Sequence, residues 1–191
     1  SCAPWITSAS TTSSGIAASA ASVVGAAIGA EELTADAVVV CLGAWSAKLL
    51  RQVGIHVPIY PVRGYSLTLP PGDRAPSVSV TSLKHKIVLG RINGNIRIAG
   101  FADFGGFDTS SDERRTQQLL DLARRVAPDA ADYSQADAQR WGGFRAMTPD
   151  GLPLSGATHI PKLYTNTGHG MLGWTLACAT SYDAAQAVAR A

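Results

Sequence analysis

The sequence has few cysteines, and their number is odd. Only 3 of its 191 residues are cysteine, namely Cys2, Cys41 and Cys178, and they lie far apart in the chain. This spacing disfavours both a disulfide framework and a cysteine-based metal site. Apolar neighbours such as Val40 and Ala177 favour buried thiols instead. We therefore expect reduced cysteines and a reducing compartment.

The sequence also lacks clustered charge and long apolar runs. Its formal net charge is only +2, without a run of Lys or Arg, which argues against nucleic-acid binding. The stretch Gly15–Ala30 is rich in Ala, Gly and Ser and is shorter than a bilayer span requires. The N-terminus does not have the pattern of a signal peptide. The 4 histidines show no metal-ligand spacing, so no metal site is predicted.

What is present is enough apolar sequence, 46% of the residues, to build a buried core. Ala37–Leu42 is short, apolar and rich in β-branched residues, as expected of a strand that is covered on both faces. A turn at Gly43 follows, and Ala44–Gln52 then predicts a helix that ends at Gly54. This strand, turn and helix indicate an α/β unit.

The middle of the chain predicts an antiparallel sheet with one covering helix. Between His56 and Gly105, short strands alternate with turns, and the pair Asn93-Gly94 is the strongest hairpin signal of the sequence. The expected strands are Val57–Leu69, Ser77–Ser82, Lys86–Arg91 and Asn95–Phe101. The spacing of the leucines in Asp112–Val126 predicts a helix with one buried face.

The two ends of the chain differ in how clearly they can be interpreted. The first 35 residues are of low complexity, and either a weak helix or two short strands fits them. Towards the other end we expect strands at Ala138–Met147 and Leu163–Thr167, followed by a helix from about Gly173 to Ala189. We find no internal repeat.

A glycine-rich loop between this last strand and helix has the spacing G-x-G-x-x-G. Such glycines let backbone N–H groups approach a ligand at the positive end of a helix. A dinucleotide fingerprint would also need a further parallel strand and an acidic residue about 20 positions later, and the sequence stops at Ala191. We therefore expect the loop to serve a cofactor in another way. It comprises Gly168, His169, Gly170, Met171, Leu172 and Gly173.

Two ordered motifs carry a family resemblance. Gly143–Gly156 reads G-F-R-A-M-T-P-D-G-L-P-L-S-G, and Gly168–Thr175 reads G-H-G-M-L-G-W-T. Together with Val38–Ser46 and Pro61–Ser66, they make the sequence similar to the C-terminal half of the D-amino-acid oxidase-like flavoenzymes, most of all the bacterial D-amino-acid dehydrogenases. Ala146 stands where many relatives have Pro. Residues 1–35 do not match the βαβ unit with which the family begins and which binds the ADP half of FAD.

The resemblance implies an α/β plus α+β fold. It would consist of an incomplete FAD-binding domain of the glutathione-reductase type with an inserted antiparallel-sheet substrate domain. The expected boundaries are residues 1–55 for the remainder of the FAD-binding domain, 56–138 for the substrate-binding domain and 139–191 for the C-terminal part of the FAD-binding domain.

The resemblance also implies site residues. Arg145 would clamp the substrate carboxylate, a task that suits a planar guanidinium, and Tyr65 and Tyr164 would line the substrate pocket. Arg63 and Arg140 are alternative candidates for the clamp, although a structural ion pair is preferred for Arg63 and a solvated face for Arg140. Trp141 and Trp174 are expected to be packing residues, with proximity to the flavin as the alternative. The flavin contacts would be Gly43, Ala44, Gly168, His169, Gly170, Met171, Leu172 and Gly173.

The implied reaction is the FAD-dependent oxidative deamination of a D-amino acid to a 2-oxo acid and ammonia, with hydride transfer to flavin N5. Electrons would pass to a quinone or another respiratory acceptor, in the cytoplasm or at the inner face of the cytoplasmic membrane. One alternative is an amine oxidase similar to glycine or sarcosine oxidase that uses dioxygen. Another is a non-catalytic fragment or subunit that needs an N-terminal nucleotide-binding polypeptide to hold FAD.

Overall fold

The computed structural model describes residues 14–18, 23–28, 30–134 and 139–190, and it divides into two compact units. Unit 1 is formed by Ser1–Pro61 and Arg145–Ala191, and unit 2 by Val62–Phe144. Unit 2 therefore interrupts unit 1 along the chain. No helix in the described ranges is both long and apolar enough to cross a membrane.

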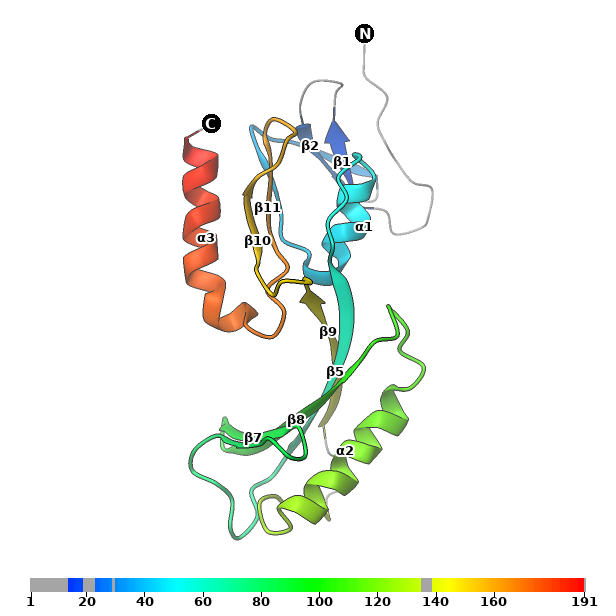
Figure 1. The fold of residues 1–191 in the computed structure, drawn as a ribbon, viewed down its shortest axis with the longest axis vertical. Coiled ribbons are helices and arrows are strands. Elements are labelled where there is room, and N and C mark those ends of the chain that lie inside the picture. The colour runs from blue at the N-terminus through cyan, green and yellow to red at the C-terminus, as the bar shows by residue number, and fades with distance from the viewer. Residues whose placement is uncertain (1–13, 19–22, 29, 135–138, 191) are drawn as a thin grey trace. The chain divides into compact units, whose positions relative to one another are not determined.

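Unit 1 contains a small mixed sheet in the order β10-β11-β4 (Figure 1). The predicted strands are confirmed as β4 (Val38–Val40) and β11 (Leu163–Thr167), whereas β10 (Leu154–Ala157) was not predicted. Strands β4 and β11 are parallel, with Val38 opposite Leu163 and Val40 opposite Thr165. Their carboxyl ends consequently meet at one edge of the sheet.

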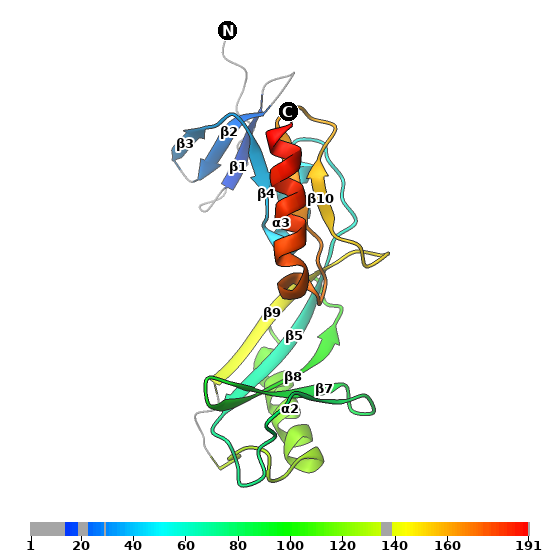
Figure 2. The ribbon, with the colours of Figure 1, turned by 90° about the vertical axis from the view of Figure 1, so that its left-hand side faces the viewer.

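Helices cover both faces of this sheet. Figure 1 and Figure 2 both show α3 along one of these faces. The short helices η1 (Gly43–Trp45) and α1 (Ser46–Arg51) follow β4, and Leu50 of α1 packs with Val40 and Leu163. The helix α3 (Gly173–Ala189) lies on the opposite face, where Asn166 of β11 donates to the Ser181 hydroxyl. The arrangement confirms the predicted α/β character of this part.

The low-complexity start of the chain forms strands rather than a helix. Strands β1 (Ser14–Ala18), β2 (Val23–Ile28) and β3 (Glu31–Thr34) pair antiparallel in this order. Val23 and Val24 in β2 are β-branched residues, which favour a pleated strand over a helix. Between the two possibilities that the sequence left open, the described residues therefore support strands.

Unit 2 is built on an antiparallel sheet in the order β6-β7-β8-β5-β9. The chain enters the unit within β5 and leaves it within β9. The predicted hairpin is confirmed, because β7 and β8 are joined at Asn93 and Gly94, which have φ angles of 50° and 82°. The strands are β5 (Tyr60–Leu69), β6 (Val80–Ser82), β7 (Ile87–Ile92), β8 (Asn95–Asp103) and β9 (Gln139–Met147).

One face of this sheet is covered by α2 (Asp112–Val126), whose bounds match the prediction. Leu119, Leu120 and Ala123 of α2 pack in one hydrophobic cluster with residues of β5, β7 and β8. Leu67 and Ile98, which are direct cross-strand partners, are fully buried in this cluster. Burial of this apolar surface is the main contribution to the stability of unit 2.

Candidate functional site

Two glycine turns meet at the carboxyl edge of the parallel strands in unit 1. Gly43 follows β4 with a φ of 54°, and Gly168 follows β11 with a φ of 76°. Both values lie in the left-handed region, which glycine adopts without strain. Ligands of open α/β sheets bind outside the carboxyl ends of the strands, so this edge is the first place to look for a cofactor.

Buried hydroxyl groups hold the two turns together. The Ser46 hydroxyl donates to Thr167 Oγ1 at 3.0 Å, and the Thr167 hydroxyl donates to the Gly43 carbonyl at 3.0 Å. Ser46 and Thr167 are 0% and 1% exposed, so water does not compete for these bonds. The relay fixes the turn after β4 against the last residue of β11. The sequence did not predict the role of either hydroxyl, because their partners lie 121 or more positions away in the chain.

The glycine-rich loop is also fastened to the end of β9. The Gly170 amide donates to the Ala146 carbonyl at 2.9 Å, and a Cβ on Gly170 would lie 3.1 Å from Met147 Sδ. A Cβ on Gly168 would lie 2.9 Å from Thr148 Cγ2, closer than side chains normally approach. The loop therefore requires glycine for space as well as for its backbone angles.

Arg145 lies directly before this contact. Since side chains alternate along a strand, Arg145 and Met147 project from the same face of β9, and Met147 packs against Gly170. Arg145 is partly buried, and this burial lowers the pKa of its guanidinium from the usual value. The side chain nevertheless stays charged near neutral pH, because the usual pKa of arginine is so high. A partly desolvated guanidinium suits a carboxylate partner.

His169 occupies the middle of the loop. Its Nε2 lies 3.0 Å from the hydroxyl of Thr180 on α3. Burial lowers the pKa of the imidazole below its usual value, which favours the neutral ring at physiological pH. Thr180 is a site residue that the sequence analysis did not identify, because it stands eleven positions from His169 and appears in no motif.

Only some amides of the loop are available to a ligand. The amides of Gly170 and Leu172 already donate to Ala146 and to His169. Those of Met171 and Gly173 have no acceptor within the described part of the chain, and Gly173 begins the 17-residue helix α3. Met171 and Gly173 therefore offer the amide donors near the positive end of the helix, whereas a contact of Leu172 with the flavin stays a prediction.

The loop carries exposed apolar side chains. Met171 is 75% exposed, Leu172 54% and Trp174 96%, so the expected packing role of Trp174 is wrong within the described residues. Trp141 of unit 2 is likewise 57% exposed and lies under the Arg97 guanidinium rather than in the core. The exposed apolar side chains of the loop itself indicate a surface that a ligand or another polypeptide covers.

Other expectations from the sequence need correction. Cys41 and Cys178 are free thiols, but both are exposed and not buried. Cys41 directly follows β4, and Cys178 lies on α3. The apolar neighbours of both residues in the sequence had predicted that these thiols are covered. Cys2 lies outside the described residues. Ala44 is 2% exposed, which leaves little of it for contact with a ligand.

The two tyrosines predicted for a substrate pocket lie in the cores of different units. Tyr65 is 2% exposed in the cluster under α2, and its hydroxyl donates to Asp103 at 3.0 Å. Tyr164 is 3% exposed in the middle of β11. Both placements favour structural roles, and we do not include these tyrosines in the proposed site.

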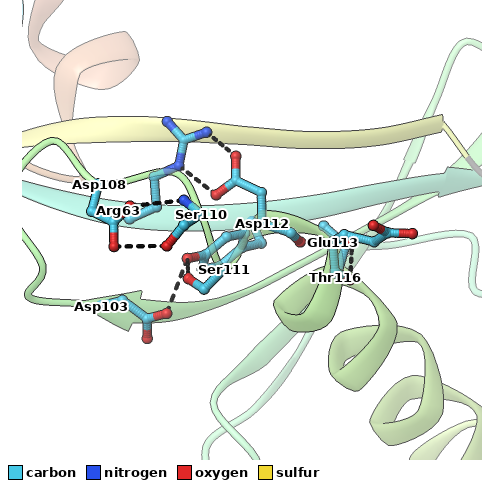
Figure 3. Close-up of polar contacts among 9 residues, drawn as sticks. Arg63, Asp103, Asp108, Ser110, Ser111, Asp112, Glu113 and Thr116 are labelled. Carbon is cyan, nitrogen blue, oxygen red and sulfur yellow. Dashed lines mark hydrogen bonds and ion pairs between the residues drawn. The ribbon is translucent and has the colours of Figure 1, made fainter.

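Arg63 forms the structural ion pair that the sequence predicted. Its guanidinium contacts both carboxylate oxygens of Asp112, the first residue of α2 (Figure 3). The face of the guanidinium lies 4.3 Å from the centre of the Phe144 ring. A second pair, between Arg115 and Asp103, ties α2 to β8. These contacts seat α2 on its sheet, while Arg140 is exposed as predicted.

The edge of unit 1 fits the ring end of a flavin. An added Cβ on Gly43 would meet no atom within 4 Å, so space lies open beside this turn. A flavin ring gains negative charge on reduction, and hydrogen-bond donors near that charge stabilise it. The free amides of Met171 and Gly173 can act as such donors. The open space at Gly43 and the free amides of the loop therefore suit the ring part of FAD.

Comparison with known proteins gives one consistent result. A family model described as FAD dependent oxidoreductase matches residues 9–187. The D-amino acid dehydrogenase of Vibrio cholerae is 49% identical over 151 residues, which are 78% of this chain and 35% of that protein. The D-amino acid dehydrogenase of Vibrio vulnificus is 45% identical over 161 residues, 83% of this chain and 38% of that protein. The chain thus spans little more than a third of these relatives.

Solved structures share the fold. Iminodiacetate oxidase from Chelativorans sp. BNC1 superimposes with a TM-score of 0.78 at 21% identity, covering 93% of this chain and 49% of that one. Glycine oxidase from Geobacillus kaustophilus superimposes with a TM-score of 0.71 at 28% identity, covering 87% of this chain and 45% of that one. The described residues therefore share the fold of these two oxidases.

Proposed function

The chain belongs to the FAD-dependent oxidoreductase family, and we propose that it is the closing portion of an enzyme that oxidises D-amino acids to 2-oxo acids and ammonia. The similarity to two D-amino acid dehydrogenases at 45% identity or more supports this substrate class. The observation that carries the proposal is the hydrogen bond from Gly170 to Ala146, because it brings the loop proposed to contact the flavin next to Arg145.

In this proposal FAD, when bound, accepts the hydride from the substrate α-carbon. Arg145 would bind the substrate carboxylate through two parallel N–H···O bonds and so orient the α-hydrogen. A guanidinium fixes both oxygens of a carboxylate, which an ammonium group does less well. The imino acid that leaves the site then hydrolyses to the 2-oxo acid and ammonia.

The glycine turns would hold the flavin ring. Gly43, Gly168 and Gly170 would allow close approach, and the amides of Met171 and Gly173 would donate to the ring carbonyl on which negative charge develops. The dipole of α3 would act in the same direction. The hydrogen bonds from Ser46 to Thr167 and from Thr167 to Gly43 would hold the two turns in place relative to each other.

We assign unit 1 to the FAD-binding domain and unit 2 to the substrate-binding domain. Strand β4 pairs with β11 along one edge and has no strand on its other edge within the described residues, and Val39 in β4 is 40% exposed. Strands of parallel sheets are normally covered on both faces. We propose that a nucleotide-binding polypeptide segment, which would bind the ADP half of FAD, adds to this edge.

The electron acceptor in our proposal is a quinone or another respiratory carrier, which would place the enzyme in the cytoplasm or at the inner face of the cytoplasmic membrane. The similarity to glycine oxidase, at 28% identity, favours a second candidate. In that case the electrons reduce dioxygen and hydrogen peroxide is formed. Peroxide production with glycine or sarcosine would separate this candidate from the dehydrogenase.

The proposal is tested by flavin binding and reduction. We expect added FAD to change its fluorescence saturably with the chain, and D-alanine to bleach the absorbance of the bound flavin without oxygen, whereas L-alanine leaves it unchanged. Loss of colour with neither enantiomer contradicts the proposal. If FAD binds only after a separate nucleotide-binding polypeptide is added, the chain acts as a subunit. If neither preparation binds FAD, it is a non-catalytic fragment.

A further inference from the structure

The contact between His169 and Thr180 determines which ring nitrogen carries the proton. The Thr180 hydroxyl lies 3.1 Å from the carbonyl of Leu176 and 3.0 Å from His169 Nε2. A carbonyl oxygen only accepts, and a hydroxyl group has a single proton to donate. For both contacts to be hydrogen bonds, Thr180 must donate to Leu176, and its oxygen must accept from His169. This arrangement requires the proton of the neutral imidazole on Nε2.

The opposite nitrogen then carries a lone pair. Within the described part of the chain, His169 Nδ1 has no hydrogen-bond partner. The contact of Nε2 with Thr180 restrains the orientation of the ring. Thr180 is 6% exposed, so its hydroxyl does not exchange its partners with bulk water. Nδ1 is thus a held, uncharged acceptor in the glycine loop.

From this geometry we propose that Thr180 is a positioning residue, which holds His169 as the Nε2–H tautomer so that Nδ1 accepts a hydrogen bond from an N–H or O–H donor of the bound flavin. The flavin contact rests on the proposed function, whereas the tautomer does not. The loop would thus offer both kinds of polar group, donors at Met171 and Gly173 and an acceptor at His169.

The tautomer is tested first, without flavin. In ¹⁵N-labelled chain near neutral pH, long-range ¹H–¹⁵N correlation reports the protonation of each ring nitrogen, and H169N identifies the signals. We expect His169 to be protonated on Nε2 alone. Thr180→Val removes the buried acceptor. We then expect the ¹⁵N chemical shifts of the two ring nitrogens to approach the averaged values of an imidazole that exchanges between its tautomers. A wild-type ring protonated on Nδ1 overturns the inference, whatever FAD does.

The flavin contact is tested by titrating FAD into matched variants and following its fluorescence. Thr180→Ser keeps the hydroxyl, and we expect an affinity within about twofold of wild type. Loss of one oriented hydrogen bond in Thr180→Val should weaken binding by roughly three- to tenfold. Circular dichroism confirms that both variants fold. The side-chain oxygen of His169→Asn lies near the position of Nδ1, so this variant should bind FAD more tightly than His169→Gln.

The outcomes separate this inference from the proposed function. If wild type binds FAD and Thr180→Val binds it equally tightly, the positioning role is wrong while the proposed function stands. If wild type binds no FAD, the isolated chain does not form the proposed cofactor site, and the proposed contact of His169 with the flavin is overturned as well. The tautomer experiment still decides in that case whether Thr180 holds the ring.

Discussion

The Gly170 amide donates a hydrogen bond of 2.9 Å to the Ala146 carbonyl, and this bond joins the motif Gly143–Gly156 to the motif Gly168–Thr175. It ties the end of β9 to the loop before α3. Arg145 and the loop therefore lie within one compact unit.

Arg145→Leu should lower the affinity for a D-amino acid substrate by about 100-fold or more, because hydrogen bonds to a charged group contribute roughly 1.5–3 kcal/mol each. Substrate dependence of flavin reduction measures the effect. Flavin content should not change, and Arg145→Lys should recover part of the affinity. Equal substrate affinity in Arg145→Leu and wild type would remove this residue from the proposed site.

Gly168→Ala should destabilise the protein by about 1–3 kcal/mol, since φ is 76° and the new Cβ would lie 2.9 Å from Thr148 Cγ2. Gly173→Ala is the matched control. Gly173 has no positive φ, and its added Cβ would make only a 3.5 Å contact with His169. Urea denaturation compares the two variants, and equal midpoints would contradict the prediction.

Thr167→Val should cost about 1–3 kcal/mol of stability, because it leaves the buried Ser46 hydroxyl without its acceptor and removes one of the two hydrogen bonds to the Gly43 carbonyl. Thr165 stands two positions earlier on the same strand and makes no side-chain hydrogen bond within the described ranges, so Thr165→Val serves as the control. The free energy of unfolding in urea measures both. A smaller loss for Thr167→Val than for Thr165→Val would show that the relay does not hold the turns.

Asp112→Asn should destabilise unit 2 by about 1–3 kcal/mol, because the side chain of Arg63 is only 10% exposed and would lose its counter-charge. The neighbouring Glu113 is exposed on the same helix, so Glu113→Gln should change stability by less than about 0.5 kcal/mol. Thermal unfolding of the two variants provides the comparison. Restored stability in Arg63→Met combined with Asp112→Asn would confirm the coupling.

Stability should fall in alkali as Tyr65 ionises. Burial is the main cause that raises the pKa of this phenol above its usual value, and Asp103 adds to the effect. The folded state thus holds the proton more tightly than the unfolded state. The resulting stability is fully present below about pH 10, the usual pKa of tyrosine, and is lost as pH rises through the higher pKa of the folded state.

Tyr65→Phe should reduce this alkaline loss of stability. The free energy of unfolding, measured by denaturant titration between neutral pH and the alkaline range, provides the test. Tyr182, which is 65% exposed, offers the matched control, and Tyr182→Phe should keep the pH dependence of wild type. The same slope in Tyr65→Phe as in wild type would mean that other groups cause the alkaline loss.

Local sequence patterns predicted the elements whose signals are local. The Asn93-Gly94 hairpin, α2 and α3 needed only turn residues and helical periodicity, and all three are confirmed. Strand β10 was missed because Leu154–Ala157 is short and contains Ser and Gly, so its strand conformation depends on pairing with β11.

The candidate site shows the same division. The spacing of the loop singled out Gly168 and Gly170, and both have positive φ angles. Ser46, Thr167 and Thr180 were not predicted, because their hydroxyls act on partners that only the fold brings near. Trp174 was predicted to pack since large aromatic residues are usually buried, yet it lies on an exposed surface.

The interruption of unit 1 by unit 2 also has a consequence for the order of folding during synthesis. Ser46 and Thr167 lie 121 positions apart, and the strand that pairs with β4 among the described residues is β11. During synthesis on the ribosome, β4 and α1 are made before unit 2. Their apolar residues therefore stay exposed until unit 2 is complete and β11 follows. Unit 2 has its own core and is able to fold first. Chaperone dependence should therefore be greatest for nascent chains that end before β11.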